Sequence, residues 1–496
     1  MKKLVVLFLL ILVSTTTAPS QTATVARNVN LRPDPSTNQD AITKLAAGVK
    51  VELLEAKPVR GYYHVQTADG KTGFVWGRNI RNLAAATTPS ASKLATATSA
   101  HVAELGQPMP LLAAGHPVDW WFVFKFNAAS FPGCDRGAER TCVFGGQVQS
   151  SWRSFSQQFA VASSEAKNLR AGSGCVGDTM DDPVGATFGE IYDGTFSYVV
   201  WNDQFYQDPQ LAACGSSNSC LAPWGHSKGV VAWDETGEGI VMQVTTPDWP
   251  GAASRQHPRA EEGNTLGCTA RDNDVLVSQH FFALKLTKSD VVKVLTALQN
   301  ASVVTDPHNT QIVKSGGPAD IGALVASLGV KSASTAVTHE TLSTGVQLIS
   351  KPSGLHAPPW QMVSSVLDGI SLRAATWWTN PGEIPSTTSA TAIDCWSTAL
   401  GAPGGVEIAT SGQFQGKTFG LKGVAKPDGN HAKIGVSTSG SHHYAIFGDM
   451  NQEGALKENC DSSQNGRGGL FFVIDDEELS NSVKDLITGG SAPIER

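Results

Sequence analysis

The 496-residue sequence has no apolar run long enough to form a membrane-spanning helix. Its clearest apolar run, residues 4–13, is ten residues long, whereas a helix that crosses a bilayer needs about 20. No two cysteines have the C-x-x-C spacing that is typical of structural zinc sites. Positive charge is also scarce, because 37 lysines and arginines stand against 44 aspartates and glutamates, giving a net charge of −7. Most nucleic-acid binders have the opposite imbalance, although the 12 histidines would add positive charge below a pH of about 6.5.

The first twenty residues have the three parts of an export signal. Lys2 and Lys3 are basic, residues 4–13 are apolar, and small residues follow. Cleavage directly after Ala18 would leave Pro19 as the first residue, so we expect a cut near residues 20–21. This pattern predicts a signal peptide over residues 1–20 and a secreted or periplasmic protein without a membrane span.

The eight cysteines all follow the predicted signal. An even number of cysteines in an exported chain indicates disulfides rather than zinc ligands. The short spacings favour two local bridges, Cys134 to Cys142 and Cys214 to Cys220. The remaining pairing is left open by the sequence.

The chain length predicts two or three globular units. Residues 23–82 contain short alternating runs separated by glycine, proline and Asp69-Gly70 turns, which is typical of a small antiparallel β-barrel. The stretches "NVNLRPDPSTNQDAITKLAAGVKVELLE" and "YYHVQTADGKTGFVWGRNI" resemble the bacterial SH-three-like barrel. This resemblance implies binding to a wall or surface polymer, and a passive spacer is the alternative. Residues 83–109 are rich in Ala, Thr and Ser and predict a flexible linker.

Residues 110–490 are expected to carry the chemistry, and two of their segments have the same layout. "GHSKGVVAWDETGEGIVMQVTTPDW" (225–249) and "NHAKIGVSTSGSHHYAIFGDMN" (430–451) each read as His-x-Lys, strand, glycine-bearing turn, strand and polar loop. We therefore expect two similar sub-domains, residues 110–300 and 301–490, around one site. Residues 289–300 predict an amphipathic helix capped by Ser289, and weaker patterns indicate helices near residues 360–368 and 476–487. The fold class expected is α/β or α+β, with mixed sheets flanked by helices.

The repeated His-x-Lys motif suggests a specific chemistry. Side chains two positions apart in a strand point to the same face, so His226 projects with Lys228, and His431 with Lys433. Two imidazoles and two ammonium groups in one pocket are costly unless an anion shares it. A phosphodiester fits, because a neutral histidine can attack phosphorus, a protonated one can donate to the leaving oxygen, and the lysines can hold the other oxygens. This scheme requires no metal or cofactor.

One competing motif overlaps the first pair. Residues 225–229 also match G-x-S-x-G, the serine-hydrolase elbow, which requires a strand before the serine and a helix after it. Pro223 and Trp224 precede the motif, and a hairpin-like pattern follows it. The sequence context therefore disfavours the elbow.

The segments "HSK" and "HAK" resemble the paired motifs of the deoxyribonuclease II family, a branch of the phospholipase D superfamily. Further matches follow in the family's order over about 350 residues: "VDWWFVFKF", "VVWNDQ", "TPDWP", "GDMN" and "RGG". The resemblance implies two phospholipase D-like sub-domains and a DNA substrate. It also implies a metal-independent, acid-favoured endonuclease that leaves 3′-phosphate ends through a phosphohistidine intermediate.

The resemblance also implies roles for individual residues. His226 is similar to the nucleophile, His431 to the general acid, and Lys228 and Lys433 to the groups that hold the phosphate. A second set resembles positions that orient these groups, and ordinary polar residues of turns are the alternative for them. The members of that set are Asn202, Asp203, Asp449 and Asn451.

Two alternatives to a nuclease remain open at this stage. The same histidines could serve a lipid phosphodiesterase, but Asp234 lies six residues after Lys228 rather than five, which favours the deoxyribonuclease branch, and no basic amphipathic helix is visible. The large region could also belong to an inactive wall- or surface-binding protein. Four tryptophans either stack on bases or belong to the core. They are Trp120, Trp121, Trp249 and Trp377.

Overall fold

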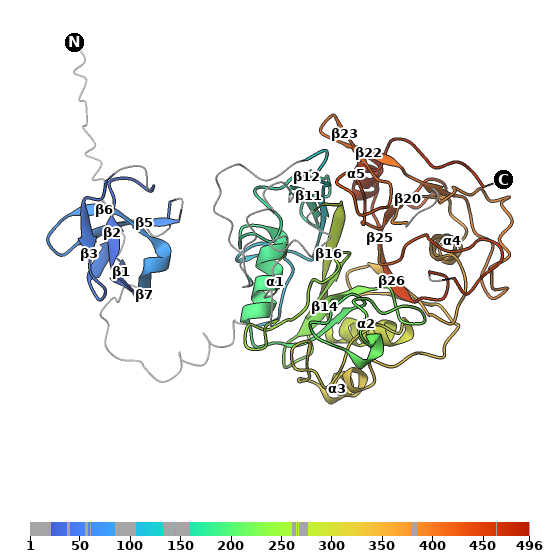
Figure 1. Cartoon of the computed structure of the whole chain (residues 1–496), viewed down its shortest axis with the longest axis horizontal. Helices are drawn as coiled ribbons and strands as arrows, with labels where there is room; N and C mark the ends of the chain where they lie inside the picture. Colours follow the sequence, from blue (N-terminus) through green and yellow to red (C-terminus); the bar gives the residue numbers. More distant parts are fainter. Residues whose placement is uncertain are drawn as a thin grey trace, which may run out of the picture. The chain divides into compact units, whose positions relative to one another are not determined.

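The structure is a computed structural model. It describes residues 21–36, 40–54, 58–59, 61–84, 106–131, 144, 158–259, 264, 266, 276–378, 384–462 and 464–495. The chain divides into two compact units, Met1–Glu104 and Leu105–Arg496 (Figure 1). The predicted signal peptide and the predicted Cys134 to Cys142 bridge lie outside the described residues.

The smaller unit is built of β-strands, as the alternating pattern predicts, with a short 3-10 helix at Gly77–Asn79. Its main sheet has the strand order β6-β5-β4-β1-β7, and β2 and β3 form a separate pair. Val25, Leu31, Val65 and Val75 are buried in its own core. The strands are β1 (Gln21–Val25), β2 (Val29–Leu31), β3 (Thr43–Leu45), β4 (Lys50–Leu53), β5 (Tyr62–Thr67), β6 (Thr72–Trp76) and β7 (Ile80–Ala84).

The larger unit contains an eight-stranded sheet with the order β12-β11-β10-β16-β15-β14-β13-β17. Its strands are β10 (Trp120–Lys125), β11 (Phe159–Ser163), β12 (Arg170–Ala171), β13 (Ser197–Asn202), β14 (Lys228–Trp233), β15 (Gly239–Val244), β16 (Gln279–Leu286) and β17 (Val313–Lys314). Neighbouring strands pair antiparallel throughout. The prediction of mixed sheets is therefore wrong for this sheet. The reason is that β13, β14, β15 and β16 follow one another as neighbours without helical crossovers, so each reverses direction.

A seven-stranded sheet with the order β18-β19-β26-β25-β24-β20-β21 completes the larger unit. Its strands are β18 (Thr338–Thr341), β19 (Gln347–Lys351), β20 (Leu372–Ala375), β21 (Val406–Ile408), β24 (Ile434–Ser437), β25 (Tyr444–Gly448) and β26 (Gly469–Asp475). This sheet is mixed, because β20 and β21 pair parallel. Two short strand pairs lie outside the sheets, β8 (Leu111–Ala113) with β9 (His116–Pro117) and β22 (Ser411–Phe414) with β23 (Lys417–Gly420). The likeness of the two halves to phospholipase D sub-domains stays a prediction.

The helices pack against these sheets. The expected helices are present as α2 (Lys288–Asn300), α4 (Pro359–Val366) and α5 (Glu477–Leu486), and α1 (Pro183–Asp193) and α3 (Ala319–Ala326) are additional. The cap of α2 is Thr287 rather than the predicted Ser289, because Thr287 and Asp290 form a reciprocal capping box. Helix α2 packs on strands of both sheets, namely β15 and β16 of the eight-stranded sheet and β18, β19 and β26 of the seven-stranded sheet (Figure 1). In the described part of the chain, no helix has both the length and the apolar content needed to cross a bilayer.

The two sheets of the larger unit share a buried aromatic layer. The ring of Phe447 on β25 lies 4.3 Å from that of Phe122 and 4.8 Å from that of Phe282, both on the eight-stranded sheet. Phe282 also contacts Phe472 on β26, with ring centroids 5.4 Å apart. One core cluster therefore includes residues from both sheets. The two His-x-Lys segments lie at the start of β14 and directly before β24, so packing of the sheets decides whether they meet.

Two disulfides are present among the described residues. Cys214 bonds Cys220, which confirms the predicted local bridge. Cys395 bonds Cys460, 65 residues away.

Replacement of Phe447 with alanine should destabilise the larger unit. Removal of a fully buried phenylalanine ring costs about 3–5 kcal/mol in free energy of unfolding. All tryptophans except Trp76 lie in this unit, so denaturant unfolding followed by tryptophan fluorescence reports on it. Val330→Ala is the control, because that side chain is 58% exposed and should change stability by about 0.5 kcal/mol or less. Equal effects of the two substitutions would contradict a shared core between the sheets.

Candidate active site

The first His-x-Lys segment lies at the start of β14. The Asn202↔Lys228 pair joins β13 to β14, and Asp203 follows directly. Nζ of Lys228 donates a hydrogen bond of 2.6 Å to the Asp203 carboxylate. The peptide N–H of His226 donates to the carbonyl of Gly468, 2.8 Å away and next to β26. The first motif is therefore anchored to the seven-stranded sheet.

The second His-x-Lys segment has the reciprocal anchor. The peptide N–H of His431 donates to the carbonyl of Ser278 over 2.7 Å. Ser278 also forms a parallel bridge with Asn430 and directly precedes β16. Each histidine is thus positioned by backbone of the sheet that does not carry it, and the structure brings the two motifs together.

The four basic side chains of the motifs are buried and act on one another electrostatically. Burial lowers the pKa of His226 well below 6.5, and Lys228 lowers it further against the opposing carboxylate of Asp203. Burial also lowers the pKa of His431 well below 6.5, and the positive charges of Lys433 and Lys228 add to this effect. Both imidazoles are therefore neutral at neutral pH in the protein alone.

Among the four basic side chains, the amino group of Lys433 is the most poorly provided with hydrogen-bond partners. Burial lowers its pKa well below 10.5, and the charge of Lys228 lowers it further. Among the described residues, Nζ of Lys433 has no hydrogen-bond partner. A buried donor of this kind is costly unless an acceptor reaches it, and an anionic oxygen would satisfy it best.

The tautomer of His226 follows from one hydrogen bond. Its Nδ1 lies 2.9 Å from the main-chain carbonyl oxygen of Asp449. A carbonyl can only accept, so Nδ1 carries the proton and donates. In the neutral ring, Nε2 then holds the lone pair, which is the state that a nucleophile requires.

The carboxylate of Asp203 bonds both Lys228 and Arg467. Its second carboxylate oxygen accepts a bond of 2.8 Å from Arg467. Burial opposes ionisation of Asp203, but Lys228 and Arg467 outweigh it and hold the pKa of the carboxyl well below its usual range. Arg467 also donates to the carbonyls of Gly225 and Cys220, each over 2.8 Å. Asp203 therefore remains charged and fixes Lys228 in place.

Asp449 differs from Asp203 because its hydrogen bonds come from neutral groups. It accepts from the hydroxyl of Ser227 at 2.5 Å and from the peptide N–H of Leu470 at 3.1 Å. No cation bonds to it among the described residues, and burial raises its pKa to about 7. Asp449 is consequently protonated in mild acid, while Asp203 is not.

The two asparagines of the predicted set differ from these carboxylates. The amide of Asn202 donates to the carbonyl of Trp249 and accepts from the peptide N–H of Gln204. These contacts fit the alternative of a polar residue that shapes a turn. Asn451 is buried, and its Oδ1 has no partner within the described ranges.

His280 is a candidate site residue that the sequence analysis missed. It is fully buried on β16, and its Nδ1 accepts the peptide N–H of Lys433 at 3.2 Å. Burial lowers the pKa of His280 well below 6.5, and Lys433 contributes to the shift. Its Nε2 must then carry the proton, and within the described residues this donor has no partner. The only signal in the sequence is a histidine within an otherwise apolar strand.

A comparison of the sequence with models of known protein families bears on this site. The sequence model of the deoxyribonuclease II family matches residues 111–490, which is more than half of the chain.

The chain belongs to the deoxyribonuclease II family.

A second model, that of the bacterial SH3 domain, matches residues 27–81. A search of curated proteins found none that matches the chain.

The structure also tests two further predictions, the serine-hydrolase elbow and the role of four tryptophans. Ser227 is followed by strand β14 rather than by a helix, and it bonds to Trp201 and Asp449, so the serine-hydrolase elbow lacks its required context. Three of the four tryptophans singled out in the sequence belong to the core, and they are Trp120, Trp121 and Trp249. Trp377 is only partly buried, and its ring lies 4.7 Å from that of His431.

Replacement of Asp449 with asparagine should change how stability depends on pH. An unfolded aspartate titrates near 3.8, whereas the folded Asp449 carboxyl titrates at about 7. Between these values the folded protein binds more protons, so this group stabilises the fold increasingly as the pH falls. Asp449→Asn should therefore gain less stability than the parent between about pH 8 and pH 4, as measured by denaturant unfolding. Asp428→Asn, at an exposed position, should follow the parent, and parallel curves for all three proteins would contradict the prediction.

Proposed function

We propose that this deoxyribonuclease II family member is an exported endonuclease that hydrolyses DNA phosphodiester bonds without a metal. The observation that supports the proposal is that two buried His-x-Lys pairs lie together. In one of them, His226 has its proton on Nδ1 and its lone pair on Nε2. The export signal predicted over residues 1–20 supports secretion or a periplasmic location. The smaller SH3-like unit would bind a wall or surface polymer.

In the proposed first step, Nε2 of His226 attacks the phosphorus atom of the scissile diester. The N–P bond forms while the bond from phosphorus to the 5′ oxygen breaks, and His431 donates a proton to that oxygen. The product is a phosphohistidine attached to the 3′ oxygen of the upstream strand. Lys228 and Lys433 hold the non-bridging oxygens, whose charge the transition state must share.

In the proposed second step, a water molecule attacks the phosphohistidine. His431, neutral after the first step, accepts a proton from this water, and the N–P bond to His226 breaks. The strand leaves with a 3′-phosphate. Both histidines return to their starting protonation states, so the cycle balances without a further reactant.

The same site predicts a preference for acid. His431 must be protonated to donate, but its pKa is lowered well below 6.5 in the protein alone. The protonated fraction of His431 therefore becomes large only when the pH falls below the pKa of a free histidine. The negative charge of a bound diester would favour protonation of His431. His226 must stay neutral over the same range, which sets the acid limit.

The direct test is cleavage of plasmid DNA in EDTA at about pH 5, below the titration point of a free histidine. The parent protein should nick and degrade the plasmid, whereas His226→Ala should lose activity by at least about a thousandfold. His308→Ala is the matched control, because His308 is an exposed histidine, and it should retain full activity. Cleavage that appears only after addition of a divalent metal would overturn the proposal.

A second test separates the roles of the two histidines. A p-nitrophenyl ester of a phosphodiester has a leaving group that needs no proton, so loss of the general acid should matter little for it. His431→Ala should lose about a hundredfold on DNA but much less in the first turnover of this ester, measured as the burst of p-nitrophenol that precedes the second step, in which His431 also acts. His226→Ala should lose activity on both substrates. The reverse pattern would exchange the assignments of nucleophile and acid.

The lipid alternative has its own readout. Release of choline from phosphatidylcholine under the same conditions, without cleavage of DNA, would favour a lipid phosphodiesterase.

A further inference from the structure

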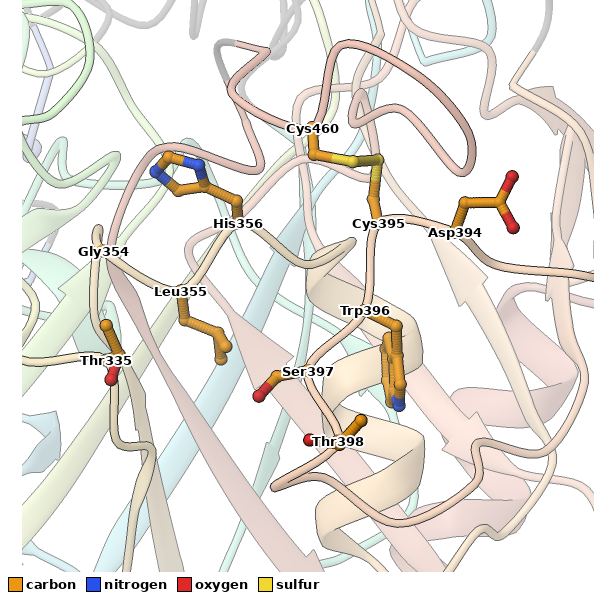
Figure 2. Close-up of a pocket in the computed structure, with 10 residues that line it drawn as sticks. All are labelled: Thr335, Gly354, Leu355, His356, Asp394, Cys395, Trp396, Ser397, Thr398 and Cys460. Atoms are coloured by element: carbon orange, nitrogen blue, oxygen red, sulfur yellow. A yellow bond between two sulfur atoms is a disulfide. The ribbon is translucent and has the colours of Figure 1, made fainter.

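A cavity of the larger unit is lined by none of the residues assigned above. It has a volume of about 500 Å³ and is lined by residues 354–356, residues 394–398, Thr335 and Cys460. Figure 2 shows it between the Cys395 to Cys460 disulfide and the segment that carries Leu355 and His356. Its size lies within the range of about 300–1,000 Å³ that is usual for small-molecule sites.

Both walls of this cavity are held in place by the fold. The disulfide between Cys395 and Cys460 ties one wall together. The peptide N–H groups of Asp394 and Cys395 both donate to the carbonyl of Leu456, at 2.9 and 3.0 Å. On the other wall, the carbonyl of Leu355 accepts a bond of 2.6 Å from the buried Nζ of Lys351. The cavity is therefore largely preformed rather than a space between loose loops.

Lys351 also connects the cavity to the candidate active site. Its Nζ donates to the carbonyls of Asn465 and Arg467, both over 2.8 Å. The guanidinium of Arg467 in turn bonds Asp203 and the carbonyl of Gly225, the residue before His226. One buried lysine thus joins the wall of the cavity to the segment that supports the first His-x-Lys pair.

The lining of the cavity is suited to a polar group that carries no negative charge. It has no lysine or arginine, and it includes the hydroxyls of Ser397 and Thr398, the carboxyl group of Asp394, the imidazole of His356 and the apolar side chain of Leu355. Figure 2 shows Ser397 and Leu355 facing each other across the space. A phosphate would find no lysine or arginine here and would lie beside the carboxyl group of Asp394. A nucleobase would find hydrogen-bonding groups for its edge and apolar surface for its faces.

We propose that this cavity is a subsite for a nucleobase of the DNA strand, next to the segment bound at the His-x-Lys pairs. The inference rests on the proposed function, because a strand must be present at the phosphate site for its neighbouring base to reach the cavity. It assigns residues 354–356 and 394–398 to substrate binding rather than to chemistry.

The test fills the cavity and compares two substrates. Ser397→Trp places a large side chain in the space, and Ala399→Trp places the same side chain at an exposed position of the same loop. Steady-state kinetics are measured in EDTA with a single-stranded DNA oligonucleotide and with bis(p-nitrophenyl) phosphate, a diester that has no base. Unfolding midpoints of both variants show whether the fold is retained.

The expected result is a KM for the oligonucleotide that rises by about tenfold in Ser397→Trp, the size typical of losing the contacts of one base. The same variant should retain the parent kcat/KM on bis(p-nitrophenyl) phosphate, and Ala399→Trp should match the parent on both substrates. An unchanged KM for the oligonucleotide, or an equal loss on both substrates, would overturn the subsite. A parent protein that cleaves neither substrate would overturn the proposed function and the subsite with it, so the two failures are distinguishable.

Discussion

The buried carboxylate of Asp203 is the constraint on which the site depends. Two cations, Lys228 and Arg467, lie against it with almost no access to water. Moving charges of this kind out of water costs several kcal/mol for each ion, and the cost is recovered only where geometry and hydrogen bonding are good. Arg467 meets this condition through three further carbonyl contacts, with Trp224, Cys220 and Gly225. The ion cluster therefore fixes at once the end of β13, the start of β14 and the loop before β26.

The second organising feature is that each histidine of the two motifs is hydrogen-bonded to backbone from the sheet that does not carry it. His226 is bonded to Asp449 and Gly468 of the seven-stranded sheet, whereas His431 is bonded to Ser278 beside β16. The aromatic layer around Phe447 brings the sheets together, and the backbone bonds then set the two imidazoles. The packing of the two sheets and the geometry of the candidate site therefore depend on the same interface.

The sequence predicted those features that depend on neighbouring residues. The spacing of His226 and Lys228, the hairpin after them, the Cys214 to Cys220 bridge and helix α2 all follow from local patterns. The matching layout of residues 225–249 and 430–451 indicated the partnership with His431 and Lys433. The family resemblance added the assignment to a deoxyribonuclease, which composition alone would have disfavoured because the chain is acidic.

Features that depend on distant residues were not predictable from these patterns. His280 and Lys351 carry no motif, and their positions have meaning only because β16 and β19 lie beside loops from elsewhere in the chain. The same is true of the Cys395 to Cys460 bridge, which closes a long segment. The cap of α2 was misplaced for a local reason, since Thr287 and Asp290 form a stronger pair than Ser289 could.

The reciprocal anchors also bear on when activity can arise during synthesis. The groups that hold His226 belong to Asp449 and Gly468, which follow it in the sequence by 223 residues or more. A nascent or truncated chain that already contains the first motif lacks the carbonyl that selects its tautomer and the arginine that steadies Asp203. A centre built in this way cannot assemble until both His-x-Lys segments and the loop before β26 have been synthesised, so the first motif alone is not a partial site.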